Sequence, residues 1–245
     1  MTRASPLDSA FLAAARRAKP VLPMDIADGG AVVILAPHAD DETLGCGQLI
    51  AALSEAGVTV QVIVVTDGAA SHRNSRIWPP ARLAALRAGE VRRAVAVLGN
   101  GKAPEPCLLG YPDLAAPDDP PGRAEAVDRI DALMPPKTTA LLATWQGDPH
   151  PDHQRVARIA ALLSRRRPAM RHWAYPVWGR FEAGVPPQPM VSLHDPALLP
   201  RKAAALAAHR SQMSPLIADD PAGFTMPATL QQHFIDHPEL FIDVG

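Results

Sequence analysis

The sequence predicts an α/β fold: a doubly wound, mostly parallel, Rossmann-like sheet in a single domain. Apolar runs of strand length occur at residues 31–36, 58–66 and 139–144, and the first two are rich in β-branched residues, as in strands buried on both faces. Segments with helical spacing of apolar residues alternate with these runs, which is the order of a parallel sheet covered by helices. Polar clusters follow two of the runs, where such sheets bind their ligands.

The composition is that of an ordinary globular protein and excludes several partners. Of the 245 residues, 47% are hydrophobic and 20% charged, and the net charge of -1 argues against a nucleic-acid partner. Cys46 and Cys107 form no CxxC pair, which indicates a reducing compartment. The first residues lack a signal-peptide pattern, and no apolar run is long enough to span a bilayer. We therefore expect a cytoplasmic protein without membrane insertion.

The first third of the chain contains a β-α-β unit behind a helical extension. Residues 5–19 resemble an amphipathic helix with Ser5 as N-cap and Pro6 in the first turn, so residues 1–30 are predicted to be an N-terminal helical extension of a domain over residues 31–245. The strand at residues 31–36 precedes a helix at 44–56, in which Gly45-Cys46-Gly47 indicates close helix–strand packing. The strand at 58–66 follows, and such a crossover is right-handed with parallel strands.

The rest of the chain continues the alternation and then becomes irregular. Pro176 suggests that the strand predicted at residues 171–178 lies at an edge of the sheet, and the basic run Arg165 to Arg167 complements the dipole of its helix. The other elements expected are helices at 81–98, 123–134, 152–165 and 200–212, a strand at 107–109, loops at 112–122 and 184–200, and a largely irregular tail at 214–245 with a short strand near Phe241.

The first polar cluster lies between the strand at residues 31–36 and the next helix. It contains His38, Asp40, Asp41 and Glu42. One imidazole and up to three carboxylates at a strand end concentrate negative charge, which is costly without a positive partner. A divalent metal ion is the simplest such partner.

The second cluster, His150-Pro151-Asp152-His153, follows the strand at residues 139–144 and opens a helix. Two imidazoles and one carboxylate from the two clusters make the ligand set of a catalytic Zn²⁺ site, and Fe²⁺ accepts the same set. The remaining carboxylate and imidazole suit hydrolysis by metal-activated water. Either cluster alone is equally well explained as a helix N-cap. The presence of both clusters, each after a buried strand of one sheet, favours a metal site over two separate helix caps.

These residues resemble the PIG-L/LmbE family of metal-dependent N-deacetylases. His38-Ala39-Asp40-Asp41-Glu42 is similar to the family signature His-Pro-Asp-Asp-Glu, with Ala39 in place of proline, and His150-Pro151-Asp152-His153 matches the second signature. Weaker similarities cover most of the chain, at Val65-Thr66-Asp67-Gly68, Arg87-x-x-Glu90, Gly110-Tyr111-Pro112-Asp113 and Lys202 to Gln212.

The resemblance implies a role for each residue. His38, Asp41 and His153 would bind Zn²⁺, and Asp40 would be the general base. His150 would stabilise the oxyanion or protonate the leaving amine, and Asp152 would orient His150. The residues themselves do not decide which of Asp40 and Asp41 binds metal. The implied reaction removes an acetyl group from a small N-acetylated, sugar-linked substrate.

Three further residues are candidate substrate contacts: Arg87, Asp113 and His209. A surface pair of Arg87 with Glu90 and turn chemistry for Asp113 are the alternatives. Glu42 is expected to cap the helix. Specificity would depend on the loops at 67–80, 112–122 and 178–200. Two other functions fit the clusters: a metal-dependent phosphoesterase, which usually needs a second metal, and a non-catalytic, metal-stabilised binding module.

Overall fold

The computed structural model describes residues 9–182 and 189–245, and its eight strands there form one sheet in the order β1-β7-β8-β6-β5-β2-β3-β4. Only β8 is antiparallel to its neighbours, so the predicted mostly parallel α/β sheet is confirmed. The strands are β1 (Lys19–Pro20), β2 (Ala31–Ala36), β3 (Val60–Thr66), β4 (Cys107–Tyr111), β5 (Thr138–Thr144), β6 (Arg171–Tyr175), β7 (Met190–Leu193) and β8 (Glu239–Asp243).

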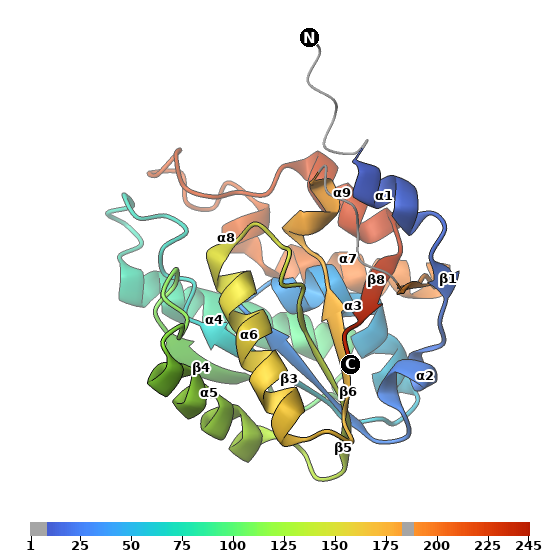
Figure 1. Cartoon of the computed structure of the whole chain (residues 1–245). Helices are drawn as coiled ribbons and strands as arrows, with labels where there is room; N and C mark the ends of the chain where they lie inside the picture. The colour runs from blue at the N-terminus through green and yellow to red at the C-terminus, as the bar shows by residue number, and fades with distance from the viewer. Residues whose placement is uncertain (1–8, 183–188) are drawn as a thin grey trace.

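Helices cover both faces of this sheet (Figure 1). They are α1 (Ala10–Ala15), α2 (Pro23–Ala27), α3 (Asp41–Glu55), α4 (Pro80–Leu98), α5 (Pro120–Leu133), α6 (Pro151–Arg166), α7 (Leu199–Ala208), α8 (Arg210–Met213) and α9 (Ala228–Asp236), with the short 3-10 helices η2 (Trp178–Phe181) and η3 (Pro196–Leu198). None of the described helices is long and apolar enough to cross a membrane.

The central strand β2 supplies both halves of the core because its side chains alternate between the faces. Ile34 and Ala36 pack with residues of α3, α4, α7 and α9. Val33 and Leu35 pack on the opposite face with residues of α5 and α6. All six residues of β2 are buried, which explains its continuous apolar sequence.

The strand order creates a crevice beside β2. From β2 the chain proceeds to β3 and β4 on one side, whereas β5 and β6 lie on its other side. Doubly wound sheets bind ligands at such a switch point, outside the carboxyl ends of the strands. The predicted polar clusters follow β2 and β5, the two strands that flank this crevice.

Close packing of α3 against the sheet is confirmed at Gly45. A Cβ atom there would lie 2.3 Å from Cδ2 of Tyr175 on β6, so only glycine allows the helix to approach this ring. The Tyr175 hydroxyl donates to the carbonyl of Leu35 at 2.8 Å. This contact ties β6 to β2 beneath the crevice.

The structure corrects the sequence predictions mainly at the two ends of the chain. In its described part the first helix is only α1, with Ser9 as N-cap, and Ser5 and Pro6 lie outside the described residues. The strand β6 is interior, between β5 and β8, because Pro176 follows its last residue. The predicted loop at 184–200 contains β7, and the predicted irregular tail contains α9 as well as the expected final strand β8.

Candidate metal centre

The turn after β2 is held in a strained conformation by buried contacts. Asp40 has a backbone φ of +140°, a value that residues other than glycine rarely adopt. Its backbone N–H donates to Glu42 Oε2 at 3.0 Å, so Glu42 caps this helix start as expected. Arg87 Nη2 donates to the carbonyl of Ala39 at 2.9 Å from the other side. These contacts fix the direction in which His38, Asp40 and Asp41 point.

The turn after β5 places two histidines at the start of α6. His150 is the N-cap of this helix, and its Nδ1 accepts a hydrogen bond from the backbone N–H of Asp152 at 3.2 Å. Since Nδ1 is an acceptor, the proton of the neutral ring lies on Nε2. His153, one turn further, is fully buried.

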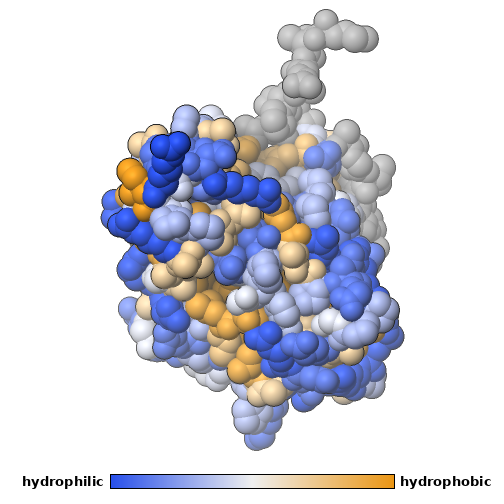
Figure 2. Space-filling model, turned by 90° about the vertical axis from the view of Figure 1, so that its left-hand side faces the viewer, coloured by the Kyte–Doolittle hydropathy of each residue, from blue (hydrophilic) through white to orange (hydrophobic). Residues whose placement is uncertain are grey.

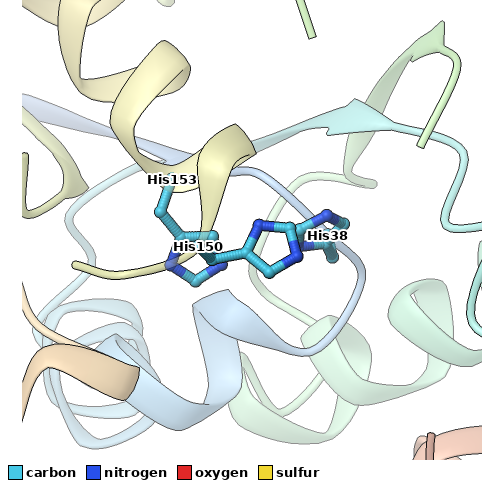
Figure 3. A group of neighbouring side chains, drawn as sticks. All are labelled: His38, His150 and His153. Atoms are coloured by element: carbon cyan, nitrogen blue, oxygen red, sulfur yellow. The ribbon is translucent and has the colours of Figure 1, made fainter. Parts of the chain in front are cut away.

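The two turns meet at the crevice, and their imidazoles cluster (Figure 3). Ligand atoms of His38, His150 and His153 lie within 4.8 Å of one another. The Oδ2 atom of Asp41 lies 3.2 Å from His38 Nδ1 and 3.3 Å from His153 Nε2. The predicted set His38, Asp41 and His153 is therefore brought together, with Asp41 between the rings.

The sequence interpretation missed Asp148, which is fully buried behind His153. Its Oδ1 lies 3.2 Å from His153 Nδ1, and its Oδ2 accepts the backbone N–H groups of Val177 and Gly179 at 3.1 and 3.0 Å. A carboxylate at Nδ1 leaves Nε2 of the ring free to bind a metal ion. Asp148 is two residues before His150, but its anchors lie in a distant segment that no local pattern connects to it.

Asp152 and Asp113 close the other side of His38. The Asp152 carboxylate lies 3.3 Å from His38 Nε2 and accepts the N–H groups of Leu114 and Ala116. Asp113 Oδ1 lies 3.2 Å from the same nitrogen. The expected contact between Asp152 and His150 is made by the backbone N–H, whereas the carboxylate faces His38. Asp113 thus lies at the centre itself, and its ligand atoms form a second candidate group with those of His38 and Asp152.

Burial penalises every charged form here, and the neighbours of each group decide its pKa. Burial lowers the pKa of both buried imidazoles, but adjacent carboxylates outweigh it, so the pKa of His38 lies well above its usual value and that of His153 rises to about 9. Burial raises the pKa of Asp41, but His153 and His38 hold it well below its usual value. The electrostatics of the centre therefore favour added positive charge.

The pKa values of Asp40 and His150 shift in the opposite direction, toward the uncharged form of each group. Burial, opposed by Arg87, raises the pKa of Asp40 to about 7. Burial and the neighbouring His38 and His153 lower the pKa of His150 to about 4. At neutral pH the Asp40 carboxyl exchanges its proton readily and His150 is uncharged, which suits a general base and a neutral hydrogen-bond donor.

A cavity of about 470 Å³ opens above the centre, lined by His38, Asp40, Asp41, Arg87, Asp113 and His150 at its polar end. Trp178 and Phe224 form its aromatic wall, with ring centroids 5.7 Å apart. The side of the molecule that carries the loops of residues 67–79 and 214–227 is mainly hydrophilic, with apolar side chains in smaller patches (Figure 2). A ligand of moderate size and mixed polarity fits such a cavity.

The three candidate substrate contacts differ in position. Arg87 and Asp113 line the cavity, although Arg87 also anchors the turn through Ala39 and the carbonyl of Gly68 at 3.0 Å. His209 is fully buried outside the cavity lining, with Nε2 3.1 Å from Glu42 Oε1. The chain bends at His209, between α7 and α8, and turns this ring toward the back of the metal-centre turn.

The donor set fits a divalent metal ion. Both ring nitrogens of His153 are buried and lack a hydrogen-bond partner of acceptable geometry in the described chain, although carboxylates lie near each. His150 Nδ1 is used by the helix cap and its Nε2 carries the ring proton, whereas His38, His153 and Asp41 can each offer a ligand atom to an ion. One carboxylate with two imidazoles leaves open coordination positions, as catalytic sites require.

Fold and site together define an α/β protein with a candidate metal centre at the switch point of a doubly wound sheet. A model of the PIG-L family, described as GlcNAc-PI de-N-acetylase, matches residues 33–163, which include both clusters. The chain therefore belongs to the PIG-L family.

Individual relatives carry deacetylase names. A 1D-myo-inositol 2-acetamido-2-deoxy-alpha-D-glucopyranoside deacetylase from Nocardia farcinica is 30% identical over 204 residues, covering 75% of this chain and 66% of that protein, slightly less than two thirds of its length. A probable N-acetyl-alpha-D-glucosaminyl L-malate deacetylase 2 from Bacillus anthracis is 26% identical over 198 residues, covering 77% of this chain and 84% of that protein.

Solved structures share the fold. The N,N'-diacetylchitobiose deacetylase from Pyrococcus horikoshii superposes with a TM-score of 0.59 at 22% identity, covering 86% of this chain and 75% of that one. A 4-carboxy-2-hydroxymuconate hydratase from Pseudomonas putida gives a TM-score of 0.60 at 16% identity, covering 84% and 82%. Because one fold carries both names, the reaction must be argued from the site.

Proposed function

We propose that the protein is a Zn²⁺-dependent hydrolase that removes the N-acetyl group from a small amino-sugar conjugate. The observation that carries this proposal is the position of the Asp41 carboxylate between His38 and His153, with Asp40 and His150 beside them at the floor of the cavity. The family membership and the deacetylase names of the relatives support it.

Each residue has a distinct role in this proposal. His38, Asp41 and His153 hold the ion, which supplies Lewis acidity that lowers the pKa of water and polarises an amide carbonyl. Asp40 takes a proton from the attacking water and passes one to the nitrogen as the C–N bond breaks, giving acetate and a free amine. His150 donates from Nε2 to the carbonyl oxygen as negative charge develops on it.

The substrate class follows from the cavity and the relatives. Asp113 and Arg87 provide polar contacts at the floor, and Trp178 and Phe224 provide flat apolar faces on which a sugar ring can stack. The three deacetylases named above take their names from N-acetylated amino sugars linked to inositol, malate or a second sugar, which makes these conjugates the first to test.

The test uses the Zn²⁺-loaded chain with this panel of N-acetylated conjugates and measures both free amine and acetate. We expect equimolar release of the two, and we expect Asp40→Asn to keep its zinc while its turnover falls by about 10²–10⁴-fold. Hydrolysis of a phosphodiester to a phosphomonoester and an alcohol, without release of acetate from any conjugate, would support the phosphoesterase alternative instead. Zinc binding without turnover of any conjugate would support the third function, a non-catalytic, metal-stabilised binding module.

A further inference from the structure

A second cavity, of about 310 Å³, lies on the other side of η2 from the metal centre. Its walls come from α1, η2, α9 and the start of β8. Trp178 on η2 lines the metal-centre cavity, whereas Arg180 on the same short helix lines this one. Among the described residues, the linings of the two cavities have no member in common.

Arg180 is a buried cation in the wall of this second cavity. It is 3% exposed, its Nη2 donates to the carbonyl of Pro238 at 3.1 Å, and its guanidinium lies 5.1 Å from the ring centroid of Phe234. Its Nε is buried and has no hydrogen-bond partner in the described part of the chain. Burial lowers the pKa of Arg180 to about 10, so the group remains charged at neutral pH.

Among the described residues, no neighbouring charge is paired with Arg180. Glu239 is the nearby buried carboxylate, and it already accepts the N–H groups of Gln48 and Leu49 and the Lys202 ammonium at 2.6, 3.0 and 2.7 Å. Within residues 9–182 and 189–245 no carboxylate lies at ion-pair distance from Arg180. The buried cations Arg180 and Lys202 therefore both lie near Glu239, but only Lys202 is paired with it. An uncompensated buried charge is costly, and a bound anion would remove that cost.

The other polar groups of the described lining carry no negative charge that would repel an anion. His233 Nε2 is buried without a partner among the described residues, and its ring stacks on His237 with centroids 4.0 Å apart. The exposed Arg16 adds a second positive charge. No carboxylate belongs to the described lining, whose remaining walls are apolar, at Leu12, Ala15 and Leu240.

We propose that this cavity is an oxyanion site, in which the Arg180 guanidinium binds the carboxylate or phosphate group of a small ligand. The planar guanidinium offers paired donors to either group. The apolar walls admit a small apolar substituent next to the anion. The site is separate from the metal centre and does not depend on the reaction proposed there.

Binding is tested with inorganic phosphate and with sodium benzoate, a carboxylate on an apolar ring. Thermal unfolding in each salt is compared with sodium chloride at equal ionic strength, and calorimetry gives the Kd. We expect the wild-type melting temperature to rise above the chloride value with at least one of the two oxyanions. The probe that binds more tightly identifies whether phosphate or carboxylate is the preferred group.

Three variants locate the site. Arg180→Met removes the buried charge at nearly constant volume and should abolish the shift. Arg16→Ala changes only an exposed side chain, so it should fold normally and bind several-fold more weakly. Arg17→Ala, the adjacent exposed arginine outside the lining, should behave as the wild type. Absence of any wild-type shift beyond chloride, or wild-type binding by Arg16→Ala together with Arg180→Met, would overturn the proposal.

Discussion

The role of Asp148 leads to a prediction about metal affinity that needs no substrate. Its Oδ2 accepts two backbone N–H groups from residues 177 and 179, while its Oδ1 faces His153 Nδ1 and accepts the N–H of His150 at 3.3 Å. In Asp148→Asn one oxygen remains. If it keeps the two N–H groups of residues 177 and 179, the new NH₂ group faces His153.

An NH₂ group at that position donates to Nδ1 and so moves the imidazole proton to Nε2, the nitrogen that faces Asp41 and the proposed ion. Loss of such an orienting carboxylate typically weakens metal binding by about 10–100-fold. That range corresponds to roughly 1.4–2.8 kcal/mol of binding free energy. The NH₂ group also meets the N–H of His150, which costs stability by roughly 1–3 kcal/mol.

Zinc affinity is measured by competition with a chromophoric chelator, and circular dichroism and urea unfolding follow the fold. Asp128→Asn is the matched control, because it makes the same chemical change at an exposed carboxylate of α5 that pairs with Arg166. We expect the control to bind zinc as the wild type does. Wild-type affinity in a folded Asp148→Asn protein would refute the orienting role of Asp148.

Three other predictions concern single residues. His150→Ala should lower the turnover number by about 10²–10³-fold because a donor to the oxyanion is lost, and should cost about 1 kcal/mol of unfolding free energy because α6 loses its N-cap; an unchanged turnover number would remove His150 from the mechanism. Glu239→Gln should destabilise the fold by about 3–5 kcal/mol in urea unfolding, since it leaves the buried Lys202 ammonium without its charge partner at 2.7 Å; a loss below 1 kcal/mol would contradict this. Burial lowers the pKa of His172 to about 4 in the folded protein, whereas the pKa in the unfolded chain is about 6.5. The folded state therefore loses up to about 3 kcal/mol of unfolding free energy as the pH falls from 6.5 toward 4, because the unfolded chain binds the proton first. The wild type should lose more stability than His172→Gln between pH 7 and 4.5, and equal losses would show that His172 does not titrate as described.

The centre of the fold could be predicted from the sequence because its signals are local. The buried strands β2, β3 and β5 have apolar runs, and two of them end at the polar clusters, so topology alone brings His38 and His153 together. The edge beyond β6 could be predicted only in part: a final strand near Phe241 is expected from the sequence, but β7 and the pairing of strands at this edge are not. The short strands β7 and β8 exist through pairing of distant residues, such as Met190 with Ile242, and neither has a strong pattern of its own.

The site residues follow the same division. The clusters identified the side chains that meet at the crevice, but not the groups that orient them. Asp148 acts through backbone N–H groups of a segment about thirty residues later, and Asp152 through Leu114 and Ala116. His209 belongs to a helix in sequence, yet a bend after α7 turns it toward Glu42. These partnerships depend on tertiary structure that periodicity does not encode.

Helix capping and chemistry are not alternatives at this site, although the sequence alone presents them so. The backbone N–H of Asp152 donates to His150 Nδ1, so the proton of the neutral ring lies on Nε2. That is the nitrogen that would donate to an oxyanion. Glu42 caps the strained Asp40 and thereby aims the proposed base. In each turn, a free backbone N–H at the start of the helix therefore fixes a side chain of the proposed reaction. In one turn it fixes the position of Asp40, and in the other it fixes the tautomer of His150. Glu42→Ala removes the acceptor of the Asp40 N–H, whereas Glu42→Gln keeps an oxygen that can accept it. Turnover should therefore fall further in Glu42→Ala than in Glu42→Gln, and equal turnover in the two folded variants would contradict the role of this cap.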